Sequence, residues 1–94
     1  MVNAGRLLPW TGEDGRPCYL VSDGSGRMAR LADDIEALQL GMAGDLLAHA
    51  AELLADSRAS SGELRYLARC LTGALGDVKR VADSRGGQLV RRER

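Results

Sequence analysis

The fold of this chain is decided by residues 49–67, which read HAAELLADSRASSGELRYL. Within this stretch, Ser60-Ser61-Gly62-Glu63 matches a capping box, in which the serine and glutamate side chains each accept a hydrogen bond from the other residue's backbone N–H at a helix start. We therefore predict that one helix begins at residue 60 and that a short connection, residues 57–59, separates it from a preceding helix. Because short connections place consecutive helices antiparallel and in contact, the stretch predicts a helical hairpin.

Apolar residues recur at spacings of three and four on both sides of this connection. The repeat is that of amphipathic helices, and it predicts helix one over residues 27–56 and helix two over residues 60–85. Gly86 is expected to end helix two, because glycine readily adopts the backbone conformation that follows a helix. We expect the repeat to form the seam of the core or of a dimer, with these side chains: Leu31, Ile35, Leu38, Met42, Leu46, His49, Leu53, Leu64, Leu67, Leu71 and Val78.

A β-hairpin is predicted for residues 6–22, where two short apolar runs flank the turn-rich stretch Gly12-Glu13-Asp14-Gly15. Residues 1–5 are predicted to be disordered. An isolated hairpin is only marginally stable, so we expect this one to lie against the helices. Trp10 and Tyr19, on its opposite arms, are candidates for core anchors or for contacts with a partner protein.

The chain has 94 residues, enough for one domain with a small core. Small domains usually need disulfides, a metal or oligomerisation, and the two cysteines and one histidine form no disulfide framework and no metal-ligand pattern. Oligomerisation is the remaining route. Helix one also carries Leu40, Leu47 and Leu54 outside its seam, and docking a second hairpin there would make a four-helix bundle. We therefore predict a mainly α protein that forms a homodimer.

Four glycines interrupt the predicted helices: Gly41 and Gly44 in helix one, and Gly73 and Gly76 in helix two. Each lowers helix stability, so a compensating reason is expected. When the hairpin is folded about residues 58–59, the two pairs fall at the same height. Three explanations remain open: a close crossing of the helices, a kink at residues 41–45 with Asp45 capping the next segment, or a small ligand pocket.

No arrangement of residues typical of catalysis or cofactor binding is present in the sequence, and we predict a chain that is not an enzyme and uses no cofactor. His49 lies on the apolar seam, which favours a packing role over catalysis. Cys18 and Cys70 have no basic neighbours that would activate a thiolate. Gly24-Ser25-Gly26 lacks the context of a phosphate-binding loop.

Acidic and basic residues balance at 13 each, so no overall charge attracts nucleic acid or a membrane. The C-terminal stretch is the exception, because residues 79–94 hold six basic and two acidic residues. An alternative function is therefore binding of nucleic acid through the basic tail, residues 86–94, and its neighbours. The candidate phosphate contacts are Lys79, Arg80, Arg85, Arg91 and Arg92. No signal peptide or membrane span is evident, and a cytoplasmic location is expected.

The stretches Leu7–Gly12, Gly15–Leu20 and Arg30–Met42 are similar to small actinobacterial, Streptomyces-type proteins of unknown function. The similarity continues through Glu63–Ala68 and Arg80–Gly86, and so covers most of the chain. It implies an accessory role beside transcriptional regulators, and it carries over no activity and no functional residue. The sequence thus favours a protein–protein interaction module, with a nucleic-acid-associated regulator or a small-ligand sensor as alternatives.

Overall fold

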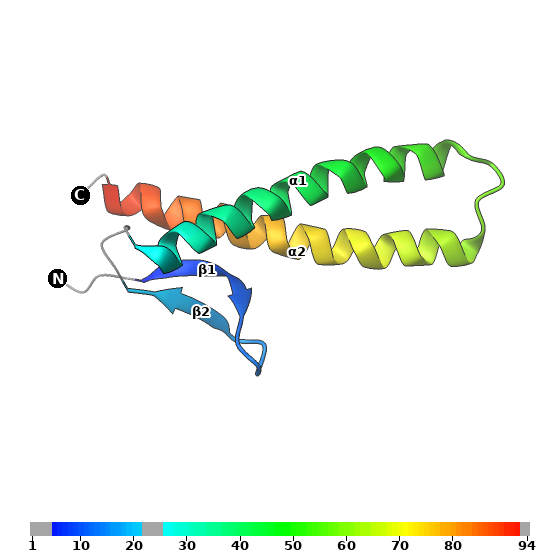
Figure 1. The fold of residues 1–94 in the computed structure, drawn as a ribbon. Helices are drawn as coiled ribbons and strands as arrows, with labels where there is room; N and C mark the ends of the chain where they lie inside the picture. The colour runs from blue at the N-terminus through cyan, green and yellow to red at the C-terminus, as the bar shows by residue number, and fades with distance from the viewer. Residues whose placement is uncertain (1–4, 22–25, 93–94) are drawn as a thin grey trace.

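The structure is a computed structural model that describes the backbone of residues 5–21 and 26–92, and side chains as far as residue 87. Its elements follow in the order β1 (Arg6–Thr11), β2 (Pro17–Leu20), α1 (Arg27–Ala55) and α2 (Ser61–Arg92). Figure 1 shows the two helices as a long antiparallel pair, with the β-hairpin against one end. The predicted fold, a β-hairpin followed by a helical hairpin, is confirmed.

The capping box forms at the start of α2 as predicted. The Ser60 backbone N–H donates to Glu63 Oε1 over 3.1 Å, and the Glu63 N–H donates to Ser60 Oγ over 3.1 Å. On the other side of the connection, the Arg58 N–H donates to Asp56 Oδ1 over 2.9 Å. These local bonds fix the short turn and therefore the antiparallel course of the helices.

One predicted helix boundary is wrong, and one of the three open explanations for the glycines is not supported. α1 runs through Gly41 and Gly44 as one element, so there is no separate segment capped by Asp45. α2 does not end at Gly86 but continues to Arg92, so most of the predicted tail is helical. Glycine weakens a helix without stopping it, and the glutamine, leucine and arginines that follow are good helix formers. Residues 1–4 and 22, assigned to the predicted disordered end and the hairpin, lie outside the described residues.

β1 and β2 form an antiparallel two-stranded sheet in which Arg6 pairs with Leu20, Leu7 with Tyr19 and Thr11 with Pro17. The pairing is irregular between Leu7 and Thr11, and Pro9 lies in this part of β1, where its missing N–H removes no regular ladder bond. In the turn, Gly15 has a φ of 77°, which glycine adopts without strain.

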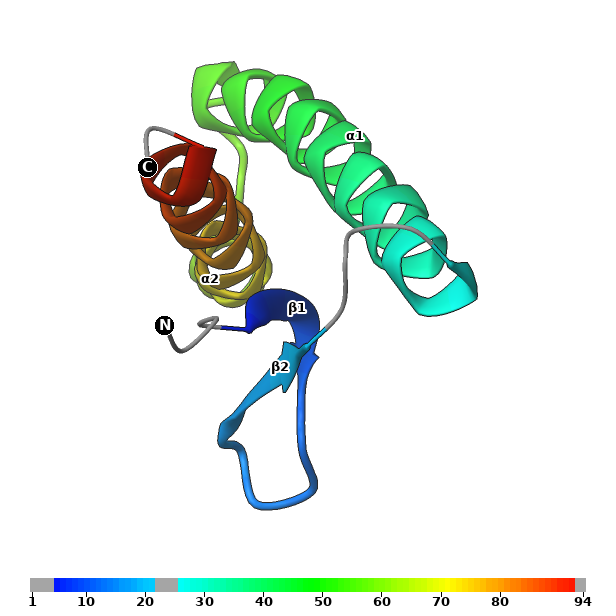
Figure 2. The ribbon, with the colours of Figure 1, turned by 90° about the vertical axis from the view of Figure 1, so that its left-hand side faces the viewer.

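The buried core is small and lies mainly where the hairpin meets the helices. Figure 2 shows the hairpin below and between α1 and α2 at this end. The buried apolar residues there are Leu8, Pro9, Ala29, Ala32 and Val81, and farther along the helices only Ala50 and Leu67 join them among the described residues. The molecule measures 57 × 28 × 22 Å, so much of the helix pair extends beyond the β-hairpin that packs against one end.

Candidate interaction surfaces

The side of α1 that faces the rest of the chain carries mostly small and polar residues. Most of its buried and half-buried positions recur every three or four residues, and we name this set the inward stripe: Ala29, Ala32, Glu36, Gln39, Ala43, Leu46, Ala50 and Leu53. Ile35 and Leu40 are half-buried beside the stripe. Four of its eight members are alanine, so it supplies little apolar area. Apart from Leu46 and Leu53, the larger apolar residues of α1 lie outside the stripe.

The seam predicted for α1 lies mostly one residue before the inward stripe. Leu31, Leu38, Met42 and His49 are exposed, and Ile35 is half-buried. Only two predicted members, Leu46 and Leu53, belong to the inward stripe. As core residues of this chain, the four exposed side chains were assigned wrongly, and their role in a dimer stays a prediction. Because one residue corresponds to about 100° around a helix, this offset turns the predicted seam of α1 away from the rest of the chain.

The seam predicted for α2 does face α1 and the hairpin. Leu67 is buried, Leu71 and Val78 are half-buried, and Leu64 is partly exposed near the turn. Val81 continues the same repeat as a buried residue. The sequence repeat therefore gave the correct inward face for α2, where it did not for α1.

A polar junction, formed by Arg6, Asp33, Glu36 and Gln39, explains the rotation of α1. The Arg6 guanidinium lies 2.7 Å from Asp33 Oδ1 and 3.2 Å from Glu36 Oε1, and it donates to the carbonyl of Ala29 over 3.1 Å. Gln39 Nε2 donates to the carbonyl of Pro9 over 3.0 Å. Glu36 is 3% exposed, so this pairing turns a charged position inward.

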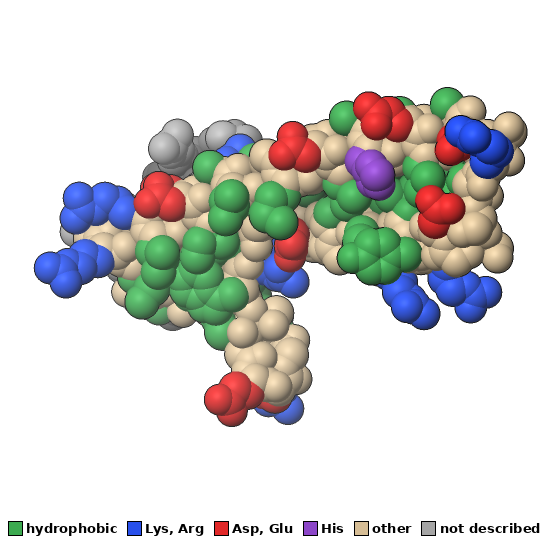
Figure 3. Space-filling model, turned by 45° about the vertical axis from the view of Figure 1, so that its right-hand side comes forward, with side chains coloured by type: hydrophobic (Ala, Val, Ile, Leu, Met, Phe, Trp, Pro, Cys, Tyr) green, Lys and Arg blue, Asp and Glu red, His purple; other side chains and the backbone are tan. Residues whose placement is uncertain are grey.

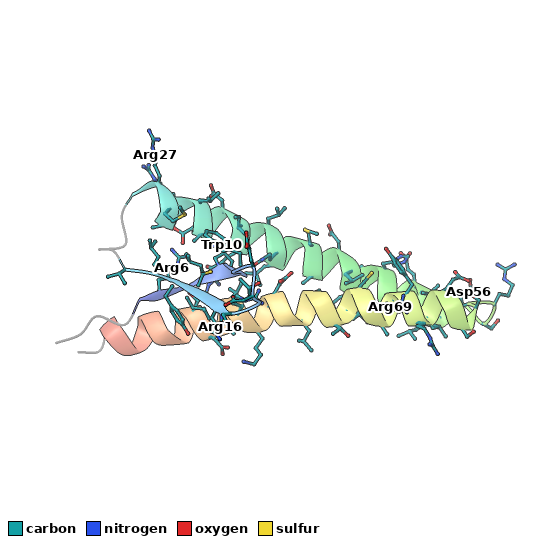
Figure 4. The ribbon with its side chains drawn as sticks, turned by 90° about the horizontal axis from the view of Figure 1, so that it is seen from below. Arg6, Trp10, Arg16, Arg27, Asp56 and Arg69 are labelled. Atoms are coloured by element: carbon teal, nitrogen blue, oxygen red, sulfur yellow. The ribbon has the colours of Figure 1, made fainter. Side chains whose placement is uncertain are left out.

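Sequence reasoning missed this junction because charged residues near a helix start are usually solvated. A signal was nevertheless present: an arginine opens the first strand, and three acidic residues, Asp33, Asp34 and Glu36, lie in the N-terminal third of helix one. Figure 4 labels Arg6 and Trp10 on β1, at the end of the molecule where the hairpin meets the helices. The junction holds β1 against α1 and contains no nucleophile, so its geometry supports a structural role.

An open groove of about 550 Å³ runs between α1 and α2 beyond the hairpin. It is lined by Gln39, Met42, Asp45, Leu46, His49, Cys70, Ala74 and Asp77. Figure 3 shows the histidine on the surface between the helices, with hydrophobic side chains beside it. Among the described residues, no three His, Cys, Asp or Glu side chains gather closely enough to hold a metal ion. Cys18 and Cys70 are both free thiols and half-buried.

The groove also shows how residues sort onto the two sides of the helix pair. Met42 and His49 each come just before an inward residue of α1, and Cys70 and Asp77 each come just before Leu71 and Val78 of α2. Residues that come just before an inward-facing residue therefore lie on the groove side of both helices. Residues that come just after an inward-facing residue must then lie together on the opposite side of the helix pair.

That opposite side is apolar, and we name it the leucine face: Leu40, Leu47 and Leu54 of α1 with Ala68, Leu75 and Ala82 of α2. Leu47, Leu54 and Leu75 are each about two-thirds exposed or more, at 65%, 71% and 69%. Leu40 is half-buried, and both alanines are exposed. The described part of the chain leaves Leu47, Leu54 and Leu75 largely uncovered.

The four helix glycines do not mark a close crossing of α1 and α2. A Cβ atom built at Gly41, Gly44, Gly73 or Gly76 would meet no described atom within 4 Å, and all four residues are exposed. None of them lines the groove either. The close-crossing explanation is therefore wrong within this chain, because the inward stripes pass one to three positions away from the glycines.

The remaining predicted residues are scattered over the surface. Trp10 is half-buried on β1, and Tyr19 is exposed on β2. Lys79 lies 2.8 Å from Asp83 and Arg80 lies 3.2 Å from Asp77, so two candidate phosphate contacts already pair with carboxylates. Arg85 is exposed, and the side chains of Arg91 and Arg92 lie outside the described residues.

Comparison with protein-family models, with curated proteins and with solved structures finds no match. Within the described residues, neither helix is long and apolar enough to cross a membrane. The function must therefore be argued from the surfaces themselves.

Proposed function

We propose that this chain is a non-enzymatic protein-interaction module whose uncovered apolar helix surface binds another protein chain. The observation that carries the proposal is an excess of exposed area. The chain exposes 7231 Å², whereas a folded monomer of 10.0 kDa exposes about 5,200 Å². Its radius of gyration is 16.7 Å, where about 12 Å is usual for a domain of this length.

The exposed area is largely apolar in places where isolated proteins avoid it. Large hydrophobic side chains are exposed along both helices and on the hairpin, namely Tyr19, Val21, Met28, Leu31, Leu38, Met42, Leu47, Leu54, Leu64, Tyr66 and Leu75. Single exposed leucines are common, but contiguous apolar patches on a soluble chain usually mark an interface. A protein partner would remove this area from water.

Nucleic-acid binding receives less support from the same geometry. Lys79 and Arg80 are engaged by carboxylates on their own helix, and the exposed surface that needs a partner is apolar. Phosphate recognition requires free cations along one face. The exposed leucines offer no such contact.

The proposal can be tested by site-specific photo-cross-linking in the native host. A photoreactive phenylalanine analogue at Leu47, which is exposed, should form a covalent adduct with another polypeptide. The same analogue at Arg58, which is exposed in the α1–α2 connection, is the matched control and should form none. If positions 47, 54 and 75 all give no polypeptide adduct, the chain is not an interaction module of this kind.

A further inference from the structure

We propose that the protein bound on the leucine face is a second copy of this chain, packed face to face as a four-helix bundle with Gly44 near its centre. This inference rests on the proposed function and names its partner. Two copies related by a twofold axis would present the same surface to each other. The surface must therefore be self-complementary in charge and in shape.

The α1 half of the leucine face is free of charge, and the α2 half carries two cations. On α1 the positions on this side are Ala37, Leu40, Gly44, Leu47, Ala51 and Leu54, which recur every three or four residues. On α2 the positions on this side are Arg65, Ala68, Thr72, Leu75, Lys79 and Ala82, of which Arg65 and Lys79 are charged. Lys79 pairs with Asp83 of its own helix over 2.8 Å. The α1 set spans about 26 Å of helix. Two adjacent apolar stripes on one side are the pattern by which helix pairs form bundles.

The groove side is a poorer surface for a second copy. Asp45 and Glu52 interrupt the corresponding stripe of α1, and Asp77 lies opposite on α2. Two copies meeting there would bring carboxylates together, and like charges in an interface cost free energy. The α1 stripe of the leucine face has no carboxylates to bring together, and Lys79 on α2 is already paired with Asp83, which favours this face over the seam predicted from the sequence.

The excess of solvent-accessible area also fits a second copy of the chain. The chain exposes 7231 Å², which is about 2,000 Å² more than a monomer of its mass requires. Permanent homodimers bury about 2,000–5,000 Å² in total, or half of that on each chain. A second copy on the leucine face would therefore account for the excess.

Gly44 gives the face its shape. It lies between Leu40 and Leu47 in the α1 stripe, it is exposed, and no described atom comes within 4 Å of a Cβ built there. A glycine flanked by leucines leaves a depression that a leucine of the facing helix can enter, as in knobs-into-holes packing. This explains a helix-weakening glycine that no contact within the chain explains.

The first experiment compares Gly44→Leu with Gly41→Leu by sedimentation equilibrium. Both glycines are exposed in α1, and leucine at either position meets open space within the chain. The unchanged protein should sediment with twice the 10.0 kDa mass of one chain. Gly44→Leu should raise the dimer dissociation constant at least about tenfold, while Gly41→Leu leaves it unchanged. Equal behaviour of the two variants would overturn the assignment of this face.

A second pair of variants tests the face without changing backbone propensity. Leu47→Glu and Leu38→Glu introduce the same charge at positions of similar exposure, 65% and 61%, on opposite sides of the inward stripe. Leu47→Glu should yield a folded monomer by circular dichroism and sedimentation, and Leu38→Glu should remain a dimer. The reverse result would place the second copy on the seam predicted from the sequence and overturn the proposal.

The outcomes also separate this inference from the proposed function. If the unchanged protein is a monomer at all micromolar concentrations but cross-links from position 47 to a different polypeptide, the partner is not a second copy and the interaction module stands. If the protein is a monomer and position 47 cross-links to nothing, both fail. A cross-linked product of twice the chain mass, lost in Leu47→Glu, supports both.

Discussion

The hairpin end and the turn end of the molecule are built from the same two helices but are covered differently. At the hairpin end, β1 adds a third element, and the buried residues there are Leu8, Pro9, Ala29, Ala32, Glu36, Val81 and Ser84. At the turn end, Ala50 and Leu67 alone reach that level of burial among the described residues, and Leu54 is 71% exposed. The two helices bury more residues where a third element covers them.

The two ends also differ in chemistry, and the difference shows how the rotation of α1 is set. The hairpin end uses a buried arginine and glutamate, which cannot be rotated outward without breaking a bonded pair. The turn end has apolar side chains on several sides of the helix, none of which fixes an orientation. Polar contacts at one end therefore decide which stripes remain free at the other.

Breaking the polar junction should have the largest effect. In Arg6→Met, Glu36 would stay buried without its cation, and such losses cost about 3–5 kcal/mol. Urea unfolding measures the change. Arg58→Met, which breaks a pair on the surface of the turn, is the control and should change stability little.

The double variant Arg6→Met with Glu36→Leu sharpens this test. Removing both charges should recover much of the lost stability, because a buried pair can often be replaced by apolar side chains. If Arg6→Met alone costs less than about 1 kcal/mol, water reaches Glu36. The hairpin end would then be no more closed than the turn end.

Placing a larger side chain in the core should destabilise the hairpin end more than the turn end, by less than the loss of the polar junction. Ala32 is 0% exposed, so Ala32→Leu should cost about 1–3 kcal/mol through displaced neighbours. Ala48→Leu makes the same substitution at an exposed position nearer the turn and should change stability by less than about 0.5 kcal/mol. Both values come from chemical unfolding. Equal costs would mean that the hairpin does not close tightly on α1.

The parts of the fold that sequence predicted correctly depend on residues close together in the chain. The capping box needs only Ser60 and Glu63, and the hairpin turn needs Gly15 at a positive φ. The seam of α2 followed because that helix has one dominant apolar stripe. Local patterns of this kind can be interpreted without knowing the rest of the structure.

The rotation of α1 could not be predicted in the same way. Its sequence offers large apolar residues on both sides of an alanine-rich stripe, and periodicity alone does not say which side turns inward. The deciding contact joins Arg6 to Glu36, thirty residues apart in the chain. The candidate surface was thus partly foreseen, since Leu40, Leu47 and Leu54 were recognised as a second apolar side, while the dimer seam was assigned elsewhere.

Removing the cap at the turn end should have a moderate effect. Ser60→Ala leaves the Glu63 N–H without its serine partner, and losses of this kind are about 1 kcal/mol. For a domain of this size, the melting temperature should fall by about 4–8 °C. Ser61→Ala, one residue later, is the control and should change it little. A loss much above this would show that the turn takes part in packing beyond the cap.

The smallest effect is expected from a glycine that faces open space. Gly76 is exposed in α2, and a Cβ there meets no described atom within 4 Å. Gly76→Ala should therefore stabilise the chain by about 0.5–1 kcal/mol through helix propensity. Thermal unfolding at several protein concentrations measures the gain.

Gly15→Ala is the matched control, because it also meets open space but has a φ of 77°. Alanine at that φ is strained, so the same substitution should destabilise by about 1 kcal/mol. The opposite signs would show that backbone conformation alone decides both results. A loss at Gly76 would instead mean that something outside the chain packs against it, and the leucine face would then not be the sole surface that a second copy covers.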